Sequence, residues 1–432
     1  MNILVVSKLG DTLSLAERIK REGHTVNFYI NDKPARVVGN SIIPKPRFSQ
    51  PLVGGESGKV LKSNVHSLLR ETQPDLVVFD MVGMGEAADY IKSLQIPVFG
   101  ASKWADFAEL DREYGTKLMK SAGIKTPPTK AFKAGQHDTA IKYVASLDNR
   151  CVYKPSGNIS TSHTYVSKGS ADMCTMLDLW KDDKEDFEIQ TFIDGVEVSC
   201  ELWWDGLSSS FHNWTMEEKK FMNEGIGPAT GCAGNVVSPI SPKSKLVSEG
   251  VGRMERLLKK SNYRGPIDLN SIVNETGLYG LEFTVRFGYD ALQALLELYR
   301  GSITELLYSI ATNSSTHPSL LPEFAIAVRI TVPPYPSSEA KSLPGIPILG
   351  ISKENLKHLW FSDISLDLDY YATAGYDGNV GCVTARGEDV RECKRRAYRT
   401  ISNLTIPQLQ YRTDIGDRVT SDLAKLKRWG YL

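Results

Sequence analysis

The sequence lacks the features that mark several classes of protein. Its 51 Lys and Arg residues balance 51 Asp and Glu residues, so the net charge gives no signal for nucleic acid or a membrane surface. No run reaches the roughly 18 apolar residues of a membrane-spanning helix, and the first residues do not form a signal peptide. The six cysteines are scattered without a CxxC pair, which favours reduced thiols over disulfides or zinc ligands. We therefore expect a cytoplasmic protein that binds neither nucleic acid nor membranes.

Two common nucleotide-binding motifs are also missing. There is no GxGxxG, which disfavours a dinucleotide, and the glycine-rich stretch GPATGCAGNVVSP (227–239) has no GK[ST] and is not a Walker loop. Its glycines would still let backbone amides approach an anion; the alternative is a plain surface loop. Just upstream, Lys219 and Lys220 would clamp a phosphate or carboxylate in the first case and would be solvated in the second.

The first hundred residues alternate short apolar runs with segments of helical periodicity. Strands are predicted at Asn2–Val6, Val26–Ile30, Leu76–Asp80 and Pro97–Gly100, and helices at Leu13–Arg21, Val60–Glu71 and Gly85–Leu94. This alternation predicts a doubly wound α/β domain with a parallel sheet. Ligands bind at the carboxyl ends of such strands, which are here Ser7–Asp11 and Asp80–Gly85.

The rest of the chain mixes strands and helices without regular alternation. A helix is predicted at Asp106–Ala122, and strands dominate after Pro318, with one amphipathic helix in VRECKRRAYRTISNL. We therefore predict a multidomain protein of α/β and α+β type. The predicted domains are residues 1–101, 102–317 and 318–432, the last of them mostly β.

Two residues are candidates for nucleotide contacts. Lys154 ends the run CVYK, just where Pro155, Ser156 and Gly157 begin a loop, so it could reach a phosphate. Glu197 follows the turn in FIDGVEVS and could accept hydrogen bonds from ribose hydroxyls. The alternatives are a solvated lysine and an exposed strand carboxylate.

The stretch GLEFTVRFGYD (280–290) predicts a strand with one apolar and one polar face. Glu282, Thr284 and Arg286 share the polar face, and Asp268 and Asn270 alternate in the same way in IDLN. Two neighbouring strands with these oxygen atoms would suit Mg²⁺. The alternative is a structural Glu282–Arg286 salt bridge.

Taken in chain order, these segments resemble the ATP-grasp ligases, specifically the phosphoribosylamine–glycine ligase (glycinamide ribonucleotide synthetase) family. The similar stretches are DLVVFDMVG, VYKPSG, QTFIDGVEVS, GPATGCAG, LEFTVRFGYD and QYRTDIGDRV. The resemblance implies a Rossmann-like (pre-ATP-grasp) N-terminal domain and a central ATP-grasp domain. The implied ATP contacts are Lys117, Lys154, Gln190, Phe192 and Glu197, and the implied metal ligands are Glu282, Asp268 and Thr284. The implied substrate contacts are Asp80, Lys220, Gly227, Pro228, Thr230, Gly231 and Asp290, and the implied catalytic cations are Arg286, Lys154 and Lys219.

The resemblance also implies a reaction. ATP would phosphorylate a carboxylate, such as that of glycine, and an amine would attack the acyl phosphate to form an amide. The implied cofactors are ATP and Mg²⁺, or Mn²⁺ in its place. The implied partners are small-molecule carboxylate and amine substrates, and the protein itself would be a monomer or homodimer. The closest activity is glycinamide ribonucleotide synthesis in purine biosynthesis.

The chain departs from this family where the family binds its amine. The GGREH-type turn after the first strand is replaced by SKLGDTLSL, with Asp11, Thr12 and Leu13, and the DPE after RFG is Tyr289-Asp290-Ala291. The loop after Lys154 lacks the family's run of glycines. The alternatives are therefore a ligase with another amine acceptor, nucleotide-like or an amino acid, and a non-catalytic nucleotide-binding homologue.

Overall fold

The N-terminal part of the computed structural model is a parallel α/β layer. The model describes residues 1–432 except 55–57, 148, 156–163, 315–317, 338–339 and 368. Four strands pair in the order β2-β1-β5-β6, all parallel. They are β1 (Asn2–Ser7), β2 (Thr25–Ile30), β5 (Leu76–Phe79) and β6 (Val98–Phe99), with helices α1 (Leu13–Arg21), α2 (Lys62–Thr72) and α3 (Gly85–Ser93) and the short pair β3 (Val53–Gly54) and β4 (Lys59–Val60). The predicted doubly wound arrangement is confirmed, and the strand order reverses between β1 and β5.

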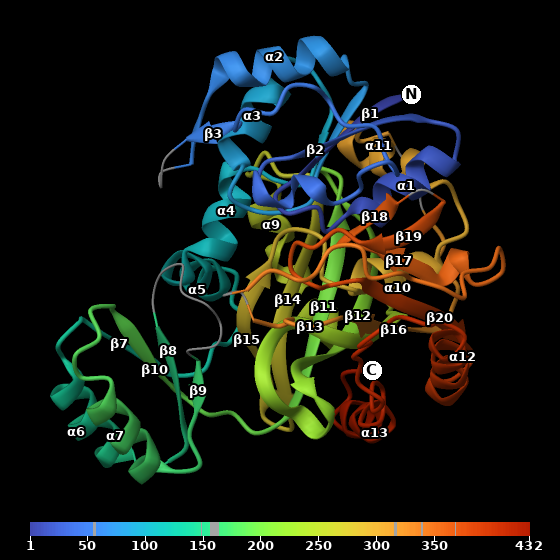
Figure 1. The fold of residues 1–432 in the computed structure, drawn as a ribbon. Helices are drawn as coiled ribbons and strands as arrows, with labels where there is room; N and C mark the ends of the chain where they lie inside the picture. Colours follow the sequence, from blue (N-terminus) through green and yellow to red (C-terminus); the bar gives the residue numbers. More distant parts are fainter. Residues whose placement is uncertain (55–57, 148, 156–163, 315–317, 338–339, 368) are drawn as a thin grey trace.

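Two helices connect this layer to the rest of the chain (Figure 1). The prediction of one helix at Asp106–Ala122 is wrong, because the chain forms α4 (Lys103–Leu110) and α5 (Arg112–Ser121) instead. Asp111 between them has an extended backbone, and its side chain accepts a hydrogen bond from the Tyr114 amide at 2.9 Å. An aspartate that caps a new helix in this way separates it from the preceding one.

A small antiparallel sheet follows, at the lower left of Figure 1. Its order is β7-β10-β8-β9. Its strands are β7 (Thr129–Phe132), β8 (Cys151–Pro155), β9 (Tyr165–Val166) and β10 (Phe187–Thr191). Helices α6 (His137–Leu147) and α7 (Ser170–Leu179) cover one face, and Phe132, Tyr153 and Phe187 are part of the apolar core between them. The other face is left free to line a cavity.

The centre of the molecule is an eight-stranded antiparallel sheet in the order β15-β14-β11-β12-β13-β16-β20-β17. Its strands are β11 (Val196–Trp204), β12 (Ser209–Met222), β13 (Ile226–Pro239), β14 (Gly265–Asn274), β15 (Gly277–Thr284), β16 (Phe324–Ile330), β17 (Leu359–Phe361) and β20 (Gly381–Gly387). Because β16, β17 and β20 follow residue 317, one sheet joins the central and C-terminal parts. The three domain boundaries stay predictions.

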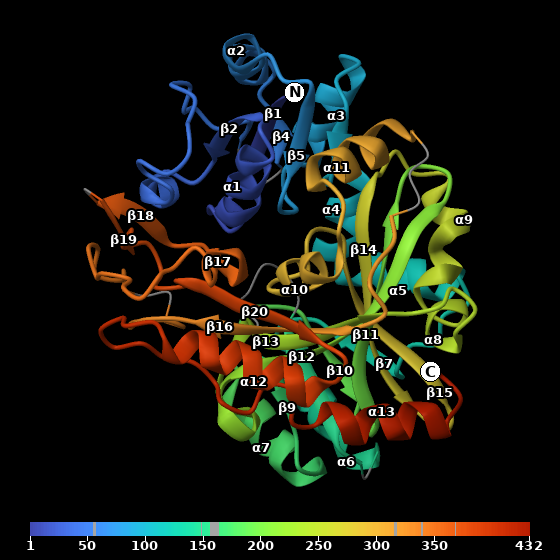
Figure 2. The ribbon, with the colours of Figure 1, turned by 90° about the vertical axis from the view of Figure 1, so that its right-hand side faces the viewer.

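Helices and one further hairpin surround this sheet. They are α8 (Lys245–Ser248), α9 (Glu255–Leu258), α10 (Ala291–Leu298), α11 (Ile303–Thr312), α12 (Val390–Ser402) and α13 (Val419–Arg428), with β18 (Ile364–Asp367) and β19 (Tyr370–Thr373). Figure 2 shows α10 and α12 on opposite faces of β16 and β20. Within the described ranges, no helix is long and apolar enough to cross a membrane.

The glycine-rich stretch 227–239 is not a surface loop, as one interpretation of the sequence had it, but part of β13. It pairs with β12 through Glu218–Gly234 and Lys220–Ala229, with register shifts between these pairs. Such shifts need unusual backbone angles, and Gly227 and Gly234 supply them with φ of +82° and +144°. The glycines therefore shape an irregular strand.

Candidate active site

A cavity of about 780 Å³ lies between the small sheet and the eight-stranded sheet. Lys154 on β8 and Gln190 on β10 line one wall, and residues of β11 to β15 line the other. The volume falls in the range of ordinary small-molecule sites, about 300 to 1,000 Å³.

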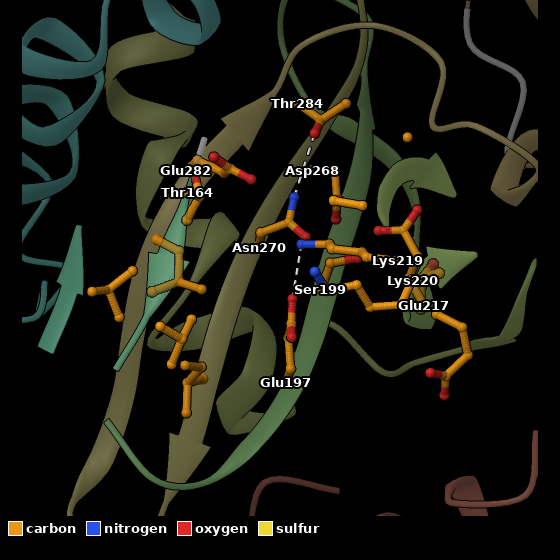
Figure 3. A pocket seen from close by; sticks show the side chains of 18 of the residues that line it. Thr164, Glu197, Ser199, Glu217, Lys219, Lys220, Asp268, Asn270, Glu282 and Thr284 are labelled. Carbon is orange, nitrogen blue, oxygen red and sulfur yellow. Dashed lines mark hydrogen bonds and ion pairs between the residues drawn. The ribbon is translucent and has the colours of Figure 1, made fainter. Parts of the chain in front are cut away.

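The floor of this cavity is the polar face of three adjacent strands (Figure 3). Ser199, Asn270 and Glu282 lie opposite one another across β11, β14 and β15. Glu201, Asp268 and Thr284 form the next row. The alternate residues, including Val198, Leu269 and Phe283, are buried in the core on the other face. The two-residue period of a strand thus puts all of these oxygen atoms on the cavity side.

Lys219 lies beside this floor with the carboxylates of Glu197 and Glu217 (Figure 3). The Lys219 ammonium is 2.8 Å from the Glu197 carboxylate. Burial lowers the pKa of Lys219, but the negative charges of Glu197, Glu217 and Glu282 outweigh this effect and raise the pKa above its usual value. Burial likewise opposes ionisation of Glu197, and Lys219 brings its pKa below the ordinary value. Both groups are therefore charged at neutral pH.

Glu282 is the carboxylate of the cavity floor that nearby cations keep ionised. Its side chain is exposed to the open cavity. Burial raises the pKa of this carboxyl group, but the positive charges of Lys219, Lys154 and Arg112 outweigh burial and hold the pKa below its ordinary value. For Lys154, burial lowers the pKa and Glu282 opposes this effect. An ionised carboxylate that faces three cations can bind a cation–polyphosphate complex, since the metal meets the carboxylate and the phosphates meet the cations.

Asp268 behaves differently, because burial outweighs the effect of Lys219 and Arg286 on its pKa. Burial raises its pKa to about 7, and burial together with Asp268 raises the pKa of Glu201 to about 8. Asp268 Oδ1 is buried and has no hydrogen-bond partner within the part of the chain that the structure describes. The Asn270 amide donates to Thr284 Oγ1 at 3.4 Å. A buried carboxylate oxygen without a partner is free to bind a cation or a hydrogen-bond donor.

These residues fit a magnesium ion that phosphates help to hold. No group of three or more His, Cys, Asp or Glu side chains with metal-binding geometry occurs among the described residues. Mg²⁺ in nucleotide sites takes only one or two carboxylates and completes its shell with phosphates and water. Glu282 with Asp268 and the neutral oxygen of Thr284 meets that requirement, as predicted from the strand alternation; their role as ligands stays a prediction.

Most of the predicted site residues line the large cavity, and their roles there stay predictions. They are Lys154, Gln190, Phe192, Glu197, Lys219, Lys220, Thr230, Gly231, Asp268, Glu282, Thr284 and Arg286. The Thr230 hydroxyl donates to the Lys219 carbonyl at 3.0 Å, so it braces the strand. The loop after Lys154, noted for its lack of glycines, lies at 156–163, outside the described residues.

Lys117 needs a correction, because the structure places it away from the cavity. Its ammonium pairs with Glu113 at 2.6 Å, on a face of α5 where the Lys117 side chain is 70 % exposed. Arg112, at the first turn of the same helix, lines the cavity instead. Its Nη1 is buried without a hydrogen-bond partner in the described structure. The prediction of one uninterrupted helix hid this residue, since the helix start at Asp111 determines which side chain faces inward.

Arg286 lies just beyond the end of β15 and does not pair with Glu282. Its Nε is 3.1 Å from Glu109 Oε1 on α4, and the other oxygen of Glu109 accepts the Val285 amide at 2.6 Å. The guanidinium carbon lies 4.4 Å from the centre of the Tyr289 ring. The alternative of a Glu282–Arg286 salt bridge is therefore wrong, and Arg286 is held at the cavity edge by α4.

Phe192 and the cavity wall beside it belong to the link between β10 and β11. The Arg150 guanidinium carbon lies 3.8 Å from the centre of the Phe192 ring. Gln190 is buried, and its amide donates to the Thr129 hydroxyl at 3.2 Å. An aromatic ring and a buried amide at a strand end suit a flat heterocycle. A base contact here stays a prediction.

Arg418, near the start of α13, also lines the cavity and was missed by the sequence analysis. It donates to the Glu217 carbonyl at 2.8 Å and to Glu218 Oε1 at 2.7 Å. These bonds fix the strand that carries Lys219. No local motif marks such a residue, because its partners lie about two hundred residues earlier.

The remaining predicted residues lie outside the large cavity. Gly227 and Pro228 are exposed at the start of β13, next to the turn from β12. Asp80 and Asp290 line a second cavity of about 20 Å³, at the carboxyl ends of β1 and β5. We call it the acidic cavity; it also contains Asp11. Gly288 and Tyr289 line both cavities, so the two adjoin.

Comparisons with known proteins agree with this geometry. Residues 110–291 match the family described as phosphoribosylglycinamide synthetase, ATP-grasp (A) domain. A phosphoribosylamine–glycine ligase of Leptospira interrogans is 26 % identical over 389 residues, which cover 85 % of this chain and 89 % of that protein.

Solved structures support the same fold. The phosphoribosylamine–glycine ligase of Thermotoga maritima superposes with a TM-score of 0.71 at 19 % identity, covering 96 % of this chain and all of that one. An L-amino acid ligase of Bacillus licheniformis has a TM-score of 0.60 at 16 % identity, covering 94 % and 98 %. ATP-grasp proteins use ATP with Mg²⁺. Residues 110–291 therefore form an ATP-grasp domain, and the chain as a whole resembles phosphoribosylamine–glycine ligase.

Proposed function

We propose that the protein is an ATP- and Mg²⁺-dependent ligase that joins a carboxylate to an amine through an acyl phosphate. The observation that carries this proposal is the ionised Glu282 carboxylate facing Lys154, Lys219 and Arg112 across the floor of a cavity large enough for a nucleotide. A site that only bound the base and ribose would not need this concentration of opposite charges.

In this proposal the cations bind the phosphates of ATP. Lys154, Lys219 and Arg112 surround the position of the transferred phosphoryl group and stabilise its negative charge. Glu282 and Asp268 would hold Mg²⁺, with Thr284 as a weaker oxygen ligand, and the ion would screen the charge between the phosphates and the incoming carboxylate. Gln190 and Phe192 would contact the base.

The reaction has two displacements. A carboxylate oxygen attacks the terminal phosphorus of ATP, and the bond from that phosphorus to the ADP oxygen breaks. The amine nitrogen then attacks the acyl carbon, the carbon–oxygen bond breaks, and phosphate leaves with the electron pair while the nitrogen loses a proton. The residues around Lys219 serve both steps, because each places new negative charge on phosphate oxygens.

The carboxylate substrate is proposed to be glycine or another small amino acid. Two similarities support this choice: a relative that ligates glycine, by its name, and a fold neighbour that is an L-amino acid ligase. In the structure, Thr230, Gly231 and Arg286 form the cavity edge beside Tyr289, where a small carboxylate would lie next to the phosphates.

ADP release in the presence of ATP, Mg²⁺, glycine and a panel of amines tests the proposal. Turnover should require both a carboxylate and an amine, and Glu282→Gln should abolish it while leaving the melting profile unchanged. ATP binding without ADP release for any carboxylate and amine would instead support a non-catalytic nucleotide-binding protein.

A further inference from the structure

The acidic cavity has a chemistry that the handling of ATP does not explain. It lies where the order of the N-terminal sheet reverses, between β1 and β5, which is the usual ligand position in such sheets. Asp80 is 2 % exposed. Its two oxygens accept the Thr12 hydroxyl at 2.8 Å and the Lys8 amide at 3.3 Å. Asp11 contributes a second carboxylate, whose Oδ2 is buried without a partner among the described residues.

Two more polar side chains in this cavity lack partners. Gln293 is 8 % exposed and Asn379 is 6 % exposed. Gln293 Oε1 and Asn379 Oδ1 accept no hydrogen bond from the part of the chain that the structure describes. Both residues line the acidic cavity. Together with Asp11 they present three unsatisfied acceptors, and buried acceptors of this kind call for a donor with several N–H groups.

The positive charges near the cavity are already paired. Arg329 binds both oxygens of Asp290 at 2.9 Å and donates to the Tyr335 hydroxyl at 3.0 Å. Arg286 is held by Glu109 at 3.1 Å. Of the described residues that line the cavity, Arg329 is the one that carries a positive charge. Neither arginine forms an ion pair with Asp11 or Asp80, although both lower the pKa of Asp11 and Arg286 lowers that of Asp80. A phosphate group would meet repulsion from these two carboxyl groups.

The volume points to the same ligand. A cavity of about 20 Å³ holds roughly one water-sized group, which matches an ammonium head group and excludes a sugar phosphate. Tyr289 forms the wall shared with the large cavity, and a Cβ added at Gly231 would lie 3.0 Å from its ring. A compound bound by its ammonium group in the acidic cavity can therefore extend past Tyr289 toward the site of the acyl phosphate.

We propose that the acidic cavity binds a positively charged amino group of the acceptor substrate, and that this acceptor carries no phosphate. The inference rests on the proposed ligase function, and it names the substrate class that the Asp11, Asp80, Gln293 and Asn379 side chains select. Burial, with the charge of Asp80 adding to it, raises the pKa of Asp11 to about 7, and burial raises the pKa of Asp80 to about 6. A bound cation would relieve both effects.

Titration calorimetry with 1,3-diaminopropane and with phosphoethanolamine, in the presence of MgATP, tests this inference. The diamine should bind the wild-type protein, and Asp11→Asn should weaken its binding at least tenfold. Asp182→Asn, an exposed aspartate far along the chain, is the matched control and should change nothing. Gln293→Leu provides a second variant, independent of the carboxylates, and should also weaken the diamine. Tighter binding of phosphoethanolamine than of the diamine would overturn the inference.

The same variants separate this inference from the proposed function. If the diamine binds in an Asp11-dependent way but no amine releases ADP, the ligase proposal fails and the cation site stands. If phosphoribosylamine or another phosphorylated amine supports ADP release equally in wild type and Asp11→Asn, the ligase proposal stands and the cation site fails. MgATP affinity should be the same in Asp11→Asn as in wild type, which shows that the nucleotide cavity is intact.

Discussion

Replacing Asp11 with Asn should stabilise the free protein, and more so at high pH. Burial raises the pKa of Asp11 to about 7 from 3.8, and Asp80 and Asp377 add to the effect while Arg329 and Arg286 oppose it. A carboxyl group whose pKa is higher in the folded than in the unfolded state resists ionisation in the fold. Its destabilising effect therefore grows as the pH rises from about 4 to about 7 and is constant above that.

The size of the effect follows from the shift. Each pKa unit corresponds to about 1.4 kcal/mol, so the wild-type carboxylate costs about 4 kcal/mol at pH 8 and about 1.7 kcal/mol at pH 5. Asparagine has no such charge, and the stability difference between variant and wild type should grow by about 2.5 kcal/mol over this range. With an unfolding entropy of about 2.1 cal/mol/K per residue, this corresponds to about 3 °C in Tm for a chain of 432 residues.

Differential scanning calorimetry at pH 5 and pH 8 measures this difference directly. Other groups also titrate between these values, but they do so in both proteins, so only the change in the Tm gap matters. Asp182→Asn should keep a constant gap to wild type. A gap between Asp11→Asn and wild type that stays the same or shrinks from pH 5 to pH 8 would refute the assignment of a raised pKa to Asp11.

Three further outcomes are expected. Glu282→Gln should lower the rate of ADP release at least 100-fold, and Mg²⁺ titration should show weaker metal dependence; full activity would remove Glu282 from the metal site. Arg112→Ala should raise the KM for ATP about tenfold, the equivalent of about 1.4 kcal/mol, whereas Lys117→Ala should leave it unchanged. A raised KM in Lys117→Ala and an unchanged one in Arg112→Ala would instead support the prediction that Lys117 contacts ATP. The affinity for 1,3-diaminopropane, measured by titration calorimetry, should rise as the pH increases from 5.5 to 8, because Asp11 and Asp80 ionise in this range. An affinity that does not change with pH would exclude these two residues as its partners.

The floor of the large cavity was predictable because it depends on local alternation. Asp268 and Asn270 on one strand, and Glu282 and Thr284 on another, were expected to face the same way, and they lie in adjacent rows of β14 and β15. Alternation, however, does not say where a strand ends. Arg286 was therefore assigned to the same face, although β15 stops at Thr284 and the guanidinium turns toward α4.

Features that depend on contacts between distant segments were not predictable. Arg112 became visible only once the helix was seen to begin after Asp111, and Arg418 reaches the cavity from the far end of the sequence. The position of the acidic cavity was anticipated in part, since ligands were expected at the strand ends Ser7–Asp11 and Asp80–Gly85. Gln293 and Asn379, which complete it, come from segments whose positions no motif marks.

The sheet shared between the central and C-terminal parts limits how the protein can be dissected. β13 pairs with β16 through residues 234–237 and 325–328. A fragment that ended at residue 317 would leave the backbone amides and carbonyls of β13 without partners along that edge. Unprotected edges of this kind recruit strands from other molecules, so such a fragment should aggregate even though it contains most of the residues that line the large cavity. Shortened versions of the protein should therefore keep the C-terminal strands attached, and natural relatives that lose them would need another strand to protect the edge.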